Sequence, residues 1–159
     1  MGEMKLELDV FSRFNDRWAL VCAGGRTGFN AMAISWGGLG TLWSRPAATV
    51  YVKPIRYTWE FLQKNDYFTV IFLPDRLKKA VGVMGSHSGR DCDKVRLAGL
   101  TPVFLENGVT FAEAETTLVC RRMYTQNMTR DTMPADVIAD YYTDEEPHTV
   151  FIGQVTEIL

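Results

Sequence analysis

Asn30-Ala31-Met32-Ala33-Ile34-Ser35-Trp36 alternates apolar residues with small and polar ones, and Gly37-Gly38-Leu39-Gly40 follows it. The alternation predicts a β-strand, and the glycines predict a binding loop after it. Small side chains at Ala31 and Ala33 would let a planar ligand approach the backbone, whose N–H and C=O groups bond the polar edge of a heteroaromatic ring. An ordinary buried strand that ends in a flexible turn is the alternative interpretation.

Short β-type runs bounded by glycine, proline or asparagine recur on both sides of this stretch. Few segments are long enough for a full amphipathic helix, so the pattern predicts a mainly β fold with short helices, and several such strands suggest a barrel. The expected strands are Trp18 to Ala23, Ala31 to Trp36, Thr49 to Val52, Tyr67 to Leu73, Val109 to Phe111, Ala114 to Thr125 and Thr149 to Ile158.

Three short helices are expected between the strands. One starts at Tyr57 or Thr58, and a second opens at Pro74-Asp75 and runs through Val81. A third follows Met133-Pro134, where the proline fits the first turn. The first two are each about three turns long.

The length of 159 residues is that of one domain, so we expect a single domain over residues 1–159. The formal net charge is -2, and the basic residues are scattered along the chain. This distribution gives no electrostatic case for nucleic acid or an anionic membrane as the partner. A small molecule is the expected ligand.

The chain has three cysteines, Cys22, Cys92 and Cys120, with no pairwise metal-binding spacing. The beginning, Met1-Gly2-Glu3-Met4-Lys5, leads into no apolar signal core. No apolar run approaches the roughly 20 residues needed to span a bilayer. We therefore expect reduced thiols, a cytoplasmic location and no membrane insertion.

A second informative segment, Val50 to Thr58, runs from a strand to the start of a helix. A helix N-terminus offers unpaired N–H groups and a partial positive charge. Thr58 adds a hydroxyl, and Lys53 and Arg56 add the cations that would neutralise a phosphate dianion. The alternative is that Thr58 only caps the helix, which is a commoner role for threonine.

The third segment, Gly85 to Lys94, combines glycines, hydroxyls and two cations. Backbone N–H groups beside Ser88, Gly89 and Arg90 would form a nest for an anion, with Lys94 neutralising charge on a phosphate or a reduced ring. A glycine-serine turn followed by a solvated charge cluster is the alternative interpretation. No metal site is expected, because no second histidine lies near the one in this segment.

Five segments, taken in order, resemble the flavin reductase-like family. Asn30 to Trp36 resembles the strand along the flavin ring, and Arg56-Tyr57-Thr58 resembles the helix start on the phosphate side. Ser88 to Lys94 is similar to the Ser-Gly-Arg-Asp-x-Asp-Lys signature of that family. Ala114 to Cys120 resembles a later barrel strand, and His148 to Val155 resembles the closing strand.

This resemblance implies a split β-barrel of the FMN-binding type that binds FMN or FAD and forms a homodimer. It also implies that Asn30 and Trp36 lie near the flavin, while Thr58 and Lys94 contact its phosphate-bearing tail or ring edge. His148 would face the pocket where a nicotinamide approaches. No residue is assigned a catalytic role. The candidate cofactor-binding residues are Asn30, Ala31, Met32, Ala33, Ser35, Trp36, Lys53, Arg56, Thr58, Ser88, Gly89, Arg90 and Lys94.

The activity implied by the resemblance is that of an FMN-binding oxidoreductase, an NAD(P)H-dependent flavin reductase. The alternative is a flavoredoxin-like electron carrier that exchanges electrons with a partner protein and does not use nicotinamide efficiently. Because Ala33 replaces a threonine found in many relatives, a split barrel that has lost flavin is a third reading. Gly37-Gly38-Leu39-Gly40 lacks the dinucleotide-binding spacing, so NADH or NADPH is expected to bind over the flavin.

Overall fold

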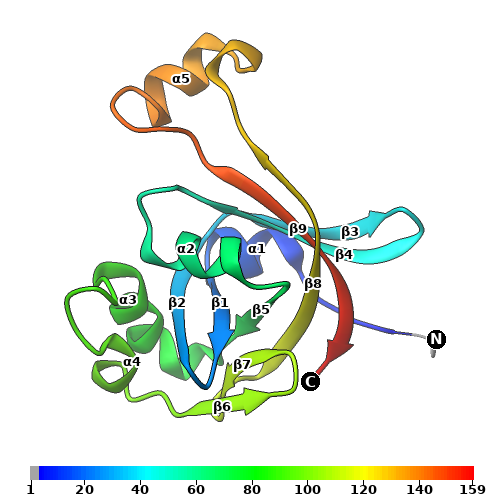
Figure 1. Ribbon diagram of the computed structural model, residues 1–159, viewed down its shortest axis with the longest axis vertical. Helices are drawn as coiled ribbons and strands as arrows, with labels where there is room; N and C mark the ends of the chain where they lie inside the picture. The colour runs from blue at the N-terminus through cyan, green and yellow to red at the C-terminus, as the bar shows by residue number, and fades with distance from the viewer. Residues whose placement is uncertain (1–3) are drawn as a thin grey trace.

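The computed structural model describes residues 4–159 (Figure 1). Residues 1–3, at the start of the expected 1–159 domain and of the Met1-Lys5 segment, lie outside the described residues. The nine strands of the described part are β1 Ala19–Gly25, β2 Gly28–Ile34, β3 Gly37–Leu42, β4 Arg45–Val52, β5 Tyr67–Phe72, β6 Pro102–Leu105, β7 Gly108–Phe111, β8 Thr116–Asn127 and β9 Thr149–Ile158. Its α-helices are α1 Val10–Asn15, α2 Tyr57–Lys64, α3 Lys78–Ser86, α4 Lys94–Leu97 and α5 Ala135–Tyr141, and its 3₁₀ turns are η1 Asp75–Leu77 and η2 Arg130–Thr132.

Seven of the strands form one antiparallel sheet in the order β2-β1-β5-β8-β9-β4-β3, and β6 pairs with β7 separately. The large sheet curls around a core, so that β2 and β3 are its two edge strands (Figure 1). The expected mainly β class with short helices, built on a split β-barrel, is confirmed.

All seven expected strands are present, although most of their ends differ by a few residues. The first expected strand began at Trp18, whose φ of 65° places it outside β1. The stretch Asn30–Trp36 contributes β2 only as far as Ile34, so Ser35 and Trp36 lie in the connection to β3. Strands β3 and β6 and helices α1 and α4 were not expected.

The glycines after Trp36 were expected to form a loop, and this prediction is wrong. They form edge strand β3, which pairs with β4 from Gly37↔Val50 to Leu42↔Arg45. Glycine is needed at Gly37 because a Cβ there would lie 2.7 Å from Cε1 of Phe14. The residue allows α1 to pack closely against the strand.

The core follows the alternation of side chains along the strands. On β1, Val21 points into the barrel with Val70 and Phe68, while Leu20 and Cys22 point outward. The outward side chains are covered by α3 and by the β6–β7 hairpin (Figure 1). A fully buried side chain of this size contributes roughly 1.5–3 kcal/mol, so both layers stabilise the sheet.

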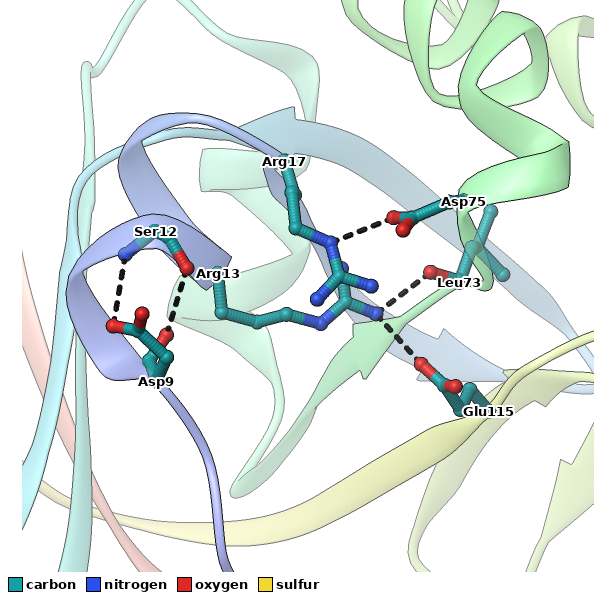
Figure 2. A network of polar contacts seen from close by, with 7 residues as sticks. All are labelled: Asp9, Ser12, Arg13, Arg17, Leu73, Asp75 and Glu115. Atoms are coloured by element: carbon teal, nitrogen blue, oxygen red, sulfur yellow. Dashed lines mark hydrogen bonds and ion pairs between the residues drawn. The ribbon is translucent and has the colours of Figure 1, made fainter.

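A buried arginine on α1 connects this helix to the end of β5 (Figure 2). Nη2 of Arg13 donates to the carbonyl of Leu73 at 2.6 Å and to Glu115 Oε2 at 3.1 Å. Burial lowers the pKa of Arg13 from its ordinary value, and Arg17 lowers it further. Beside it, Arg17 Nε donates to Asp75 Oδ1 at 2.6 Å. The two arginines fix α1 across one side of the barrel.

Helix α2 is fixed in its first turn and at its C-terminal end. Trp59 Nε1 donates to Thr149 Oγ1 of β9 at 2.9 Å. Nη1 of Arg122 on β8 donates to the carbonyls of Leu62 and Gln63, at 3.0 and 3.3 Å. The orphan carbonyls at the helix end therefore have a charged donor, and the position of the helix start is set by the barrel.

Strands β8 and β9 extend beyond the barrel, and the chain between them carries α5 at the end of the molecule farthest from β6 and β7 (Figure 1). Register shifts at Val119/Cys120 and Arg122/Tyr124 interrupt the pairing of these two strands. Such irregularities bend a strand and increase its twist. None of the helices in residues 4–159 combines the length and apolar character needed to span a membrane.

Candidate functional site

Two adjoining cavities lie along β2. The first, of about 390 Å³, is bounded by β2, the start of α2, the end of α3 and the turn that follows α3. The second, of about 330 Å³, lies between the end of β2, the end of β4 and α5. Both have the size of small-molecule sites, roughly 300–1,000 Å³. They share Met32, Ala33 and Arg56, so together they form one cleft.

The structure distributes the candidate residues over these two cavities. Residues of the second and third sequence segments line mainly the first cavity, while Trp36 and His148 meet in the second. Ala31 lines neither, because its side chain is fully buried in the outer core beside Cys22. The first cavity takes Asn30, Thr58, Ser88, Gly89, Arg90 and Lys94, and the second takes Ser35, Trp36, Lys53 and His148.

Asn30 joins three elements at the first cavity. Its Nδ2 donates to Thr58 Oγ1 on α2 at 2.8 Å. Its Oδ1 lies so close to Gly89 that a Cβ there would overlap it. The pair fixes β2, α2 and the turn after α3 relative to one another. The Thr58 oxygen accepts this bond, so the hydroxyl still has its own hydrogen to donate.

The helix start is not capped by Thr58, so that alternative interpretation is wrong. Arg56 occupies the N-cap position with extended backbone and makes no side-chain capping bond. Among residues 4–159, no side chain accepts from the N–H of Tyr57 or Thr58. The two N–H groups and the positive end of the helix dipole are therefore available to an anion.

The three cations of the first cavity differ in how far protein groups already satisfy them. Arg90 forms an ion pair with Glu60, donates to the Ile55 carbonyl at 3.2 Å and lies 4.8 Å from the ring centre of Tyr57. The guanidinium of Arg56 is exposed and has no hydrogen bond or ion pair within residues 4–159. Arg56 is therefore the cation best placed to bind an anionic ligand.

Lys94 is only 4% exposed and occupies a structural position as well as lining the cavity. Its Nζ donates to the carbonyls of Met84 and His87, each at 3.1 Å. Burial lowers the pKa of Lys94 from its ordinary value. The ammonium thus closes the C-terminal end of α3 and retains one further hydrogen for a ligand.

The turn after α3 uses part of its expected anion nest for its own bonds. The N–H of Arg90 donates to Ser88 Oγ at 3.2 Å. The N–H groups of Asp91 and Cys92 donate to the Ser88 carbonyl at 3.0 and 3.3 Å. The Arg90 N–H is therefore not directed at a ligand, and a nest here is limited to Ser88 and Gly89.

Aromatic side chains gather in the second cavity. The Trp36 ring lies 5.3 Å from that of Tyr141 in an edge-to-face arrangement and 5.2 Å from that of His148. Tyr142 Oη lies 2.7 Å from Nδ1 of His148. Burial, with Lys53 and Arg56 nearby, lowers the pKa of His148 to about 4. The imidazole is therefore neutral at pH 7.

The structure separates Lys53 from Thr58, although both were assigned to one phosphate site. Lys53 lines the second cavity, where its Nζ is 2.6 Å from Glu145 Oε2 and 5.7 Å from the ring centre of Tyr142. Arg56 is the residue that reaches both cavities. The role of Lys53 in binding phosphate stays a prediction.

Several lining residues were not singled out from the sequence. Met84 and Ser86 at the end of α3 line the first cavity, and Tyr51 and Asp140 line the second. Tyr141 lines the second cavity as well, and its contact with Trp36 joins segments far apart in the chain. No local pattern marks such residues as cavity-lining.

Solved structures with a similar fold include the following three proteins. Flavoredoxin from Methanosarcina acetivorans has a TM-score of 0.73 at 21% identity, covering 100% of this chain and 75% of that one. The FMN-binding protein from Thermus thermophilus with bound 1-cyclohex-2-enone has a TM-score of 0.70 at 21% identity, covering 100% and 80%. Nitrilotriacetate monooxygenase component B from Bacillus cereus has a TM-score of 0.70 at 17% identity, covering 89% and 68%. At these identities the likeness establishes the fold.

No curated protein matches the sequence significantly. The family model described as flavin reductase like domain, in contrast, matches residues 11–159. Because this match spans nearly all of the chain, it confirms the resemblance carried by the five sequence segments. The chain belongs to the family of flavin reductase like domains.

Proposed function

We propose that this protein binds FMN in the cleft along β2 and acts as an oxidoreductase, an NAD(P)H-dependent flavin reductase. The observation that carries the proposal is the position of Arg56, an exposed cation at the uncapped start of α2 where the two cavities meet. The family match and the FMN-binding neighbour of the same fold support FMN as the flavin.

The residues of the first cavity fit the phosphate-bearing part of FMN. Arg56 supplies a free positive charge, and α2 supplies two free N–H groups at its start. The hydroxyl of Thr58 and the remaining hydrogen of the Lys94 ammonium add donors. A phosphate needs such donors, and charge-assisted hydrogen bonds of this kind are the strong ones.

The second cavity fits a planar ring. Trp36 and Tyr141 provide aromatic surface, and the shared lining residues Met32 and Ala33 are uncharged. When bound, the flavin would supply the redox chemistry, in which a hydride is accepted and the electrons are passed on. The chain's own residues would bind and orient the ring, and the neutral His148, which lines this cavity, would face an approaching second ring.

The test begins with the absorbance spectrum of the purified protein, before and after addition of FMN. NADH and then NADPH are added without oxygen to the same sample, followed by dithionite. Bleaching by a nicotinamide supports the reductase. Bleaching only by dithionite supports a flavoredoxin-like carrier with a partner protein, a reading that the flavoredoxin fold neighbour favours. Absence of flavin binding would contradict both and favour a split barrel with another ligand.

The phosphate site is tested by replacing Arg56 with glutamine. Loss of a charge-assisted hydrogen bond is expected to lower the affinity for FMN by about tenfold to a hundredfold. Arg45→Gln is the matched control, because Arg45 begins β4 and lines neither cavity. Equal FMN affinity in the two folded variants, measured by fluorescence titration, would contradict the assignment.

Several further features are part of the proposal. FAD would bind in place of FMN if the first cavity accommodates its adenylate extension. The same fluorescence titration, carried out with FAD, measures this affinity. The homodimer, the cytoplasmic location and the organisation of residues 1–159 as a single domain stay predictions.

A further inference from the structure

The ring of His148 is fixed by a buried tyrosine. Tyr142, at the C-terminal end of α5, is 5% exposed, and its Oη lies 2.7 Å from Nδ1 of His148. Burial raises the pKa of Tyr142 above its ordinary value, so the phenol keeps its hydrogen. Arg130 Nε donates to the Tyr142 carbonyl at 2.9 Å and fixes the backbone beside it. The pair is thus preorganised before any ligand binds.

The direction of the Tyr142–His148 hydrogen bond follows from what else is available to the phenol. A buried hydroxyl hydrogen without an acceptor is costly. Within residues 4–159, Nδ1 of His148 is the acceptor found for this hydroxyl. The opposite arrangement, with Nδ1–H donating, would leave the phenolic hydrogen unbonded. Tyr142 therefore donates to Nδ1, and a neutral imidazole then carries its hydrogen on Nε2.

The Nε2 atom of His148 is not fully buried. This atom has no hydrogen-bond partner within residues 4–159. Every buried side-chain nitrogen or oxygen in this part of the chain has a partner, so Nε2 does not belong to the buried atoms. It follows that Nε2 is accessible, and the open space beside His148 is the second cavity. The ring of Trp36, 5.2 Å away, forms the neighbouring wall of this space.

We propose that Tyr142 locks His148 in the Nε2–H tautomer, so that the second cavity presents a neutral hydrogen-bond donor to the carbonyl oxygen of a planar ring. The inferred ligand group is an uncharged carbonyl, such as the carboxamide of a nicotinamide. Tyr142 is a positioning residue, and His148 is the residue that contacts the ligand. The carbonyl part rests on the proposed function, whereas the lock rests on the Tyr142–His148 geometry alone.

The lock is tested by NMR on protein with ¹⁵N-labelled histidine. The chain has two histidines, and a His87→Gln variant assigns their signals. Two-bond ¹H–¹⁵N correlations distinguish the tautomers, and His148 is expected to show the Nε2–H pattern at neutral pH. Tyr142→Phe is expected to produce a mixture of both tautomers. Tyr141→Phe is the matched control, since the hydroxyl of Tyr141 has no partner in residues 4–159.

A wild-type spectrum with the Nδ1–H pattern or a tautomer mixture would overturn the lock. So would a folded Tyr142→Phe variant that retains the wild-type pattern. Because the wild-type spectrum is itself a test, the lock remains falsifiable if Tyr142→Phe does not fold. Neither measurement needs flavin, so failure of the lock is distinguishable from failure of the proposed function.

The ligand class is tested with nicotinamide as the probe and pyridine, a similar ring without a carbonyl, as its control. In FMN-loaded protein, nicotinamide is expected to shift the Nε2 signal of His148, and pyridine is not. Tyr142→Phe is expected to lower the affinity for nicotinamide by about threefold to tenfold, the range for one hydrogen bond. The affinity for FMN is expected to stay unchanged. No response to nicotinamide, or an equal response to pyridine, would overturn the carbonyl assignment.

Discussion

At the scale of single residues, Asn30 and Gly89 form a coupled pair. Asn30 bonds Thr58, and its Oδ1 occupies the space that a Cβ on residue 89 would need. We expect Gly89→Ala to destabilise the protein by about 1–3 kcal/mol, the range for overpacking. In an Asn30→Ala background the same substitution is expected to cost less, because the amide it would overlap is absent.

A double-mutant cycle followed by urea unfolding measures this coupling. Contacting residues give coupling energies of about 0.5–3 kcal/mol. Gly82→Ala on α3 is the control, since a Cβ there meets nothing within 4 Å. Additive free energies for Asn30 and Gly89 would show that they are not in contact.

His148 makes folding stability depend on pH. The pKa of His148 is about 4 in the folded protein against an ordinary 6.5, because burial, Lys53 and Arg56 disfavour the charged ring more than Glu145 favours it. Between these values the unfolded chain binds a proton that the folded chain does not. The contribution is fully present above pH 6.5 and is lost as the pH falls toward 4.

Urea unfolding at about pH 7.5 and about pH 5 checks this expectation, since one such proton changes stability by at most about 1.4 kcal/mol per pH unit. His148→Gln is expected to show a smaller loss of stability on acidification than the wild type, because glutamine does not titrate. An identical loss in both proteins would exclude His148 as the source.

At the scale of elements, β3 shows why a glycine-rich segment was misread. Its side chains carry little β pattern, and the strand is specified by its pairing with β4 and by the approach of Phe14 to Gly37. The strands predicted from the sequence, such as β5 and β9, have apolar alternation or a continuous apolar run. Local patterns were sufficient for these strands and insufficient for an edge strand.

Gly37→Ala tests this account of β3. The new Cβ would lie 2.7 Å from Phe14 Cε1 and 3.1 Å from the Thr49 carbonyl, so we expect a loss of roughly 1–3 kcal/mol and a lower Tm. Gly38→Ala is the control, because its Cβ meets nothing within 4 Å. If thermal unfolding shows equal effects, the close approach of α1 is not what requires glycine at Gly37.

At the scale of the whole molecule, the sequence predicted the split barrel and placed most candidate residues on one cleft. It did not predict how those residues divide between two cavities, because the division depends on contacts such as Trp36 with Tyr141 on α5. It also did not predict that Lys94 and Arg90 are held by protein carbonyls and Glu60. Such partners are set by the tertiary structure.

The predicted homodimer also belongs to this scale. Trp43, at the tip of the β3–β4 hairpin, is 60% exposed, and its ring lies 6.5 Å from that of the exposed Tyr124 on β8. Exposed aromatic pairs are typical of interaction surfaces. We expect sedimentation analysis to show a dimer that Trp43→Ser weakens. Phe11→Ser, which removes an exposed ring from α1, is the control. A dimer that Trp43→Ser leaves unaffected would place the interface elsewhere.

The three cysteines differ in ways that matter for chemical labelling. Cys22 and Cys120 are buried in the two core layers, and burial raises the pKa of Cys22 to about 12, so neither is a ready target for a maleimide. Cys92 is half-buried in the turn beside the first cavity. A thiol-reactive fluorophore would therefore attach at Cys92 without engineering, and its emission would give a real-time optical signal from a position next to the first cavity.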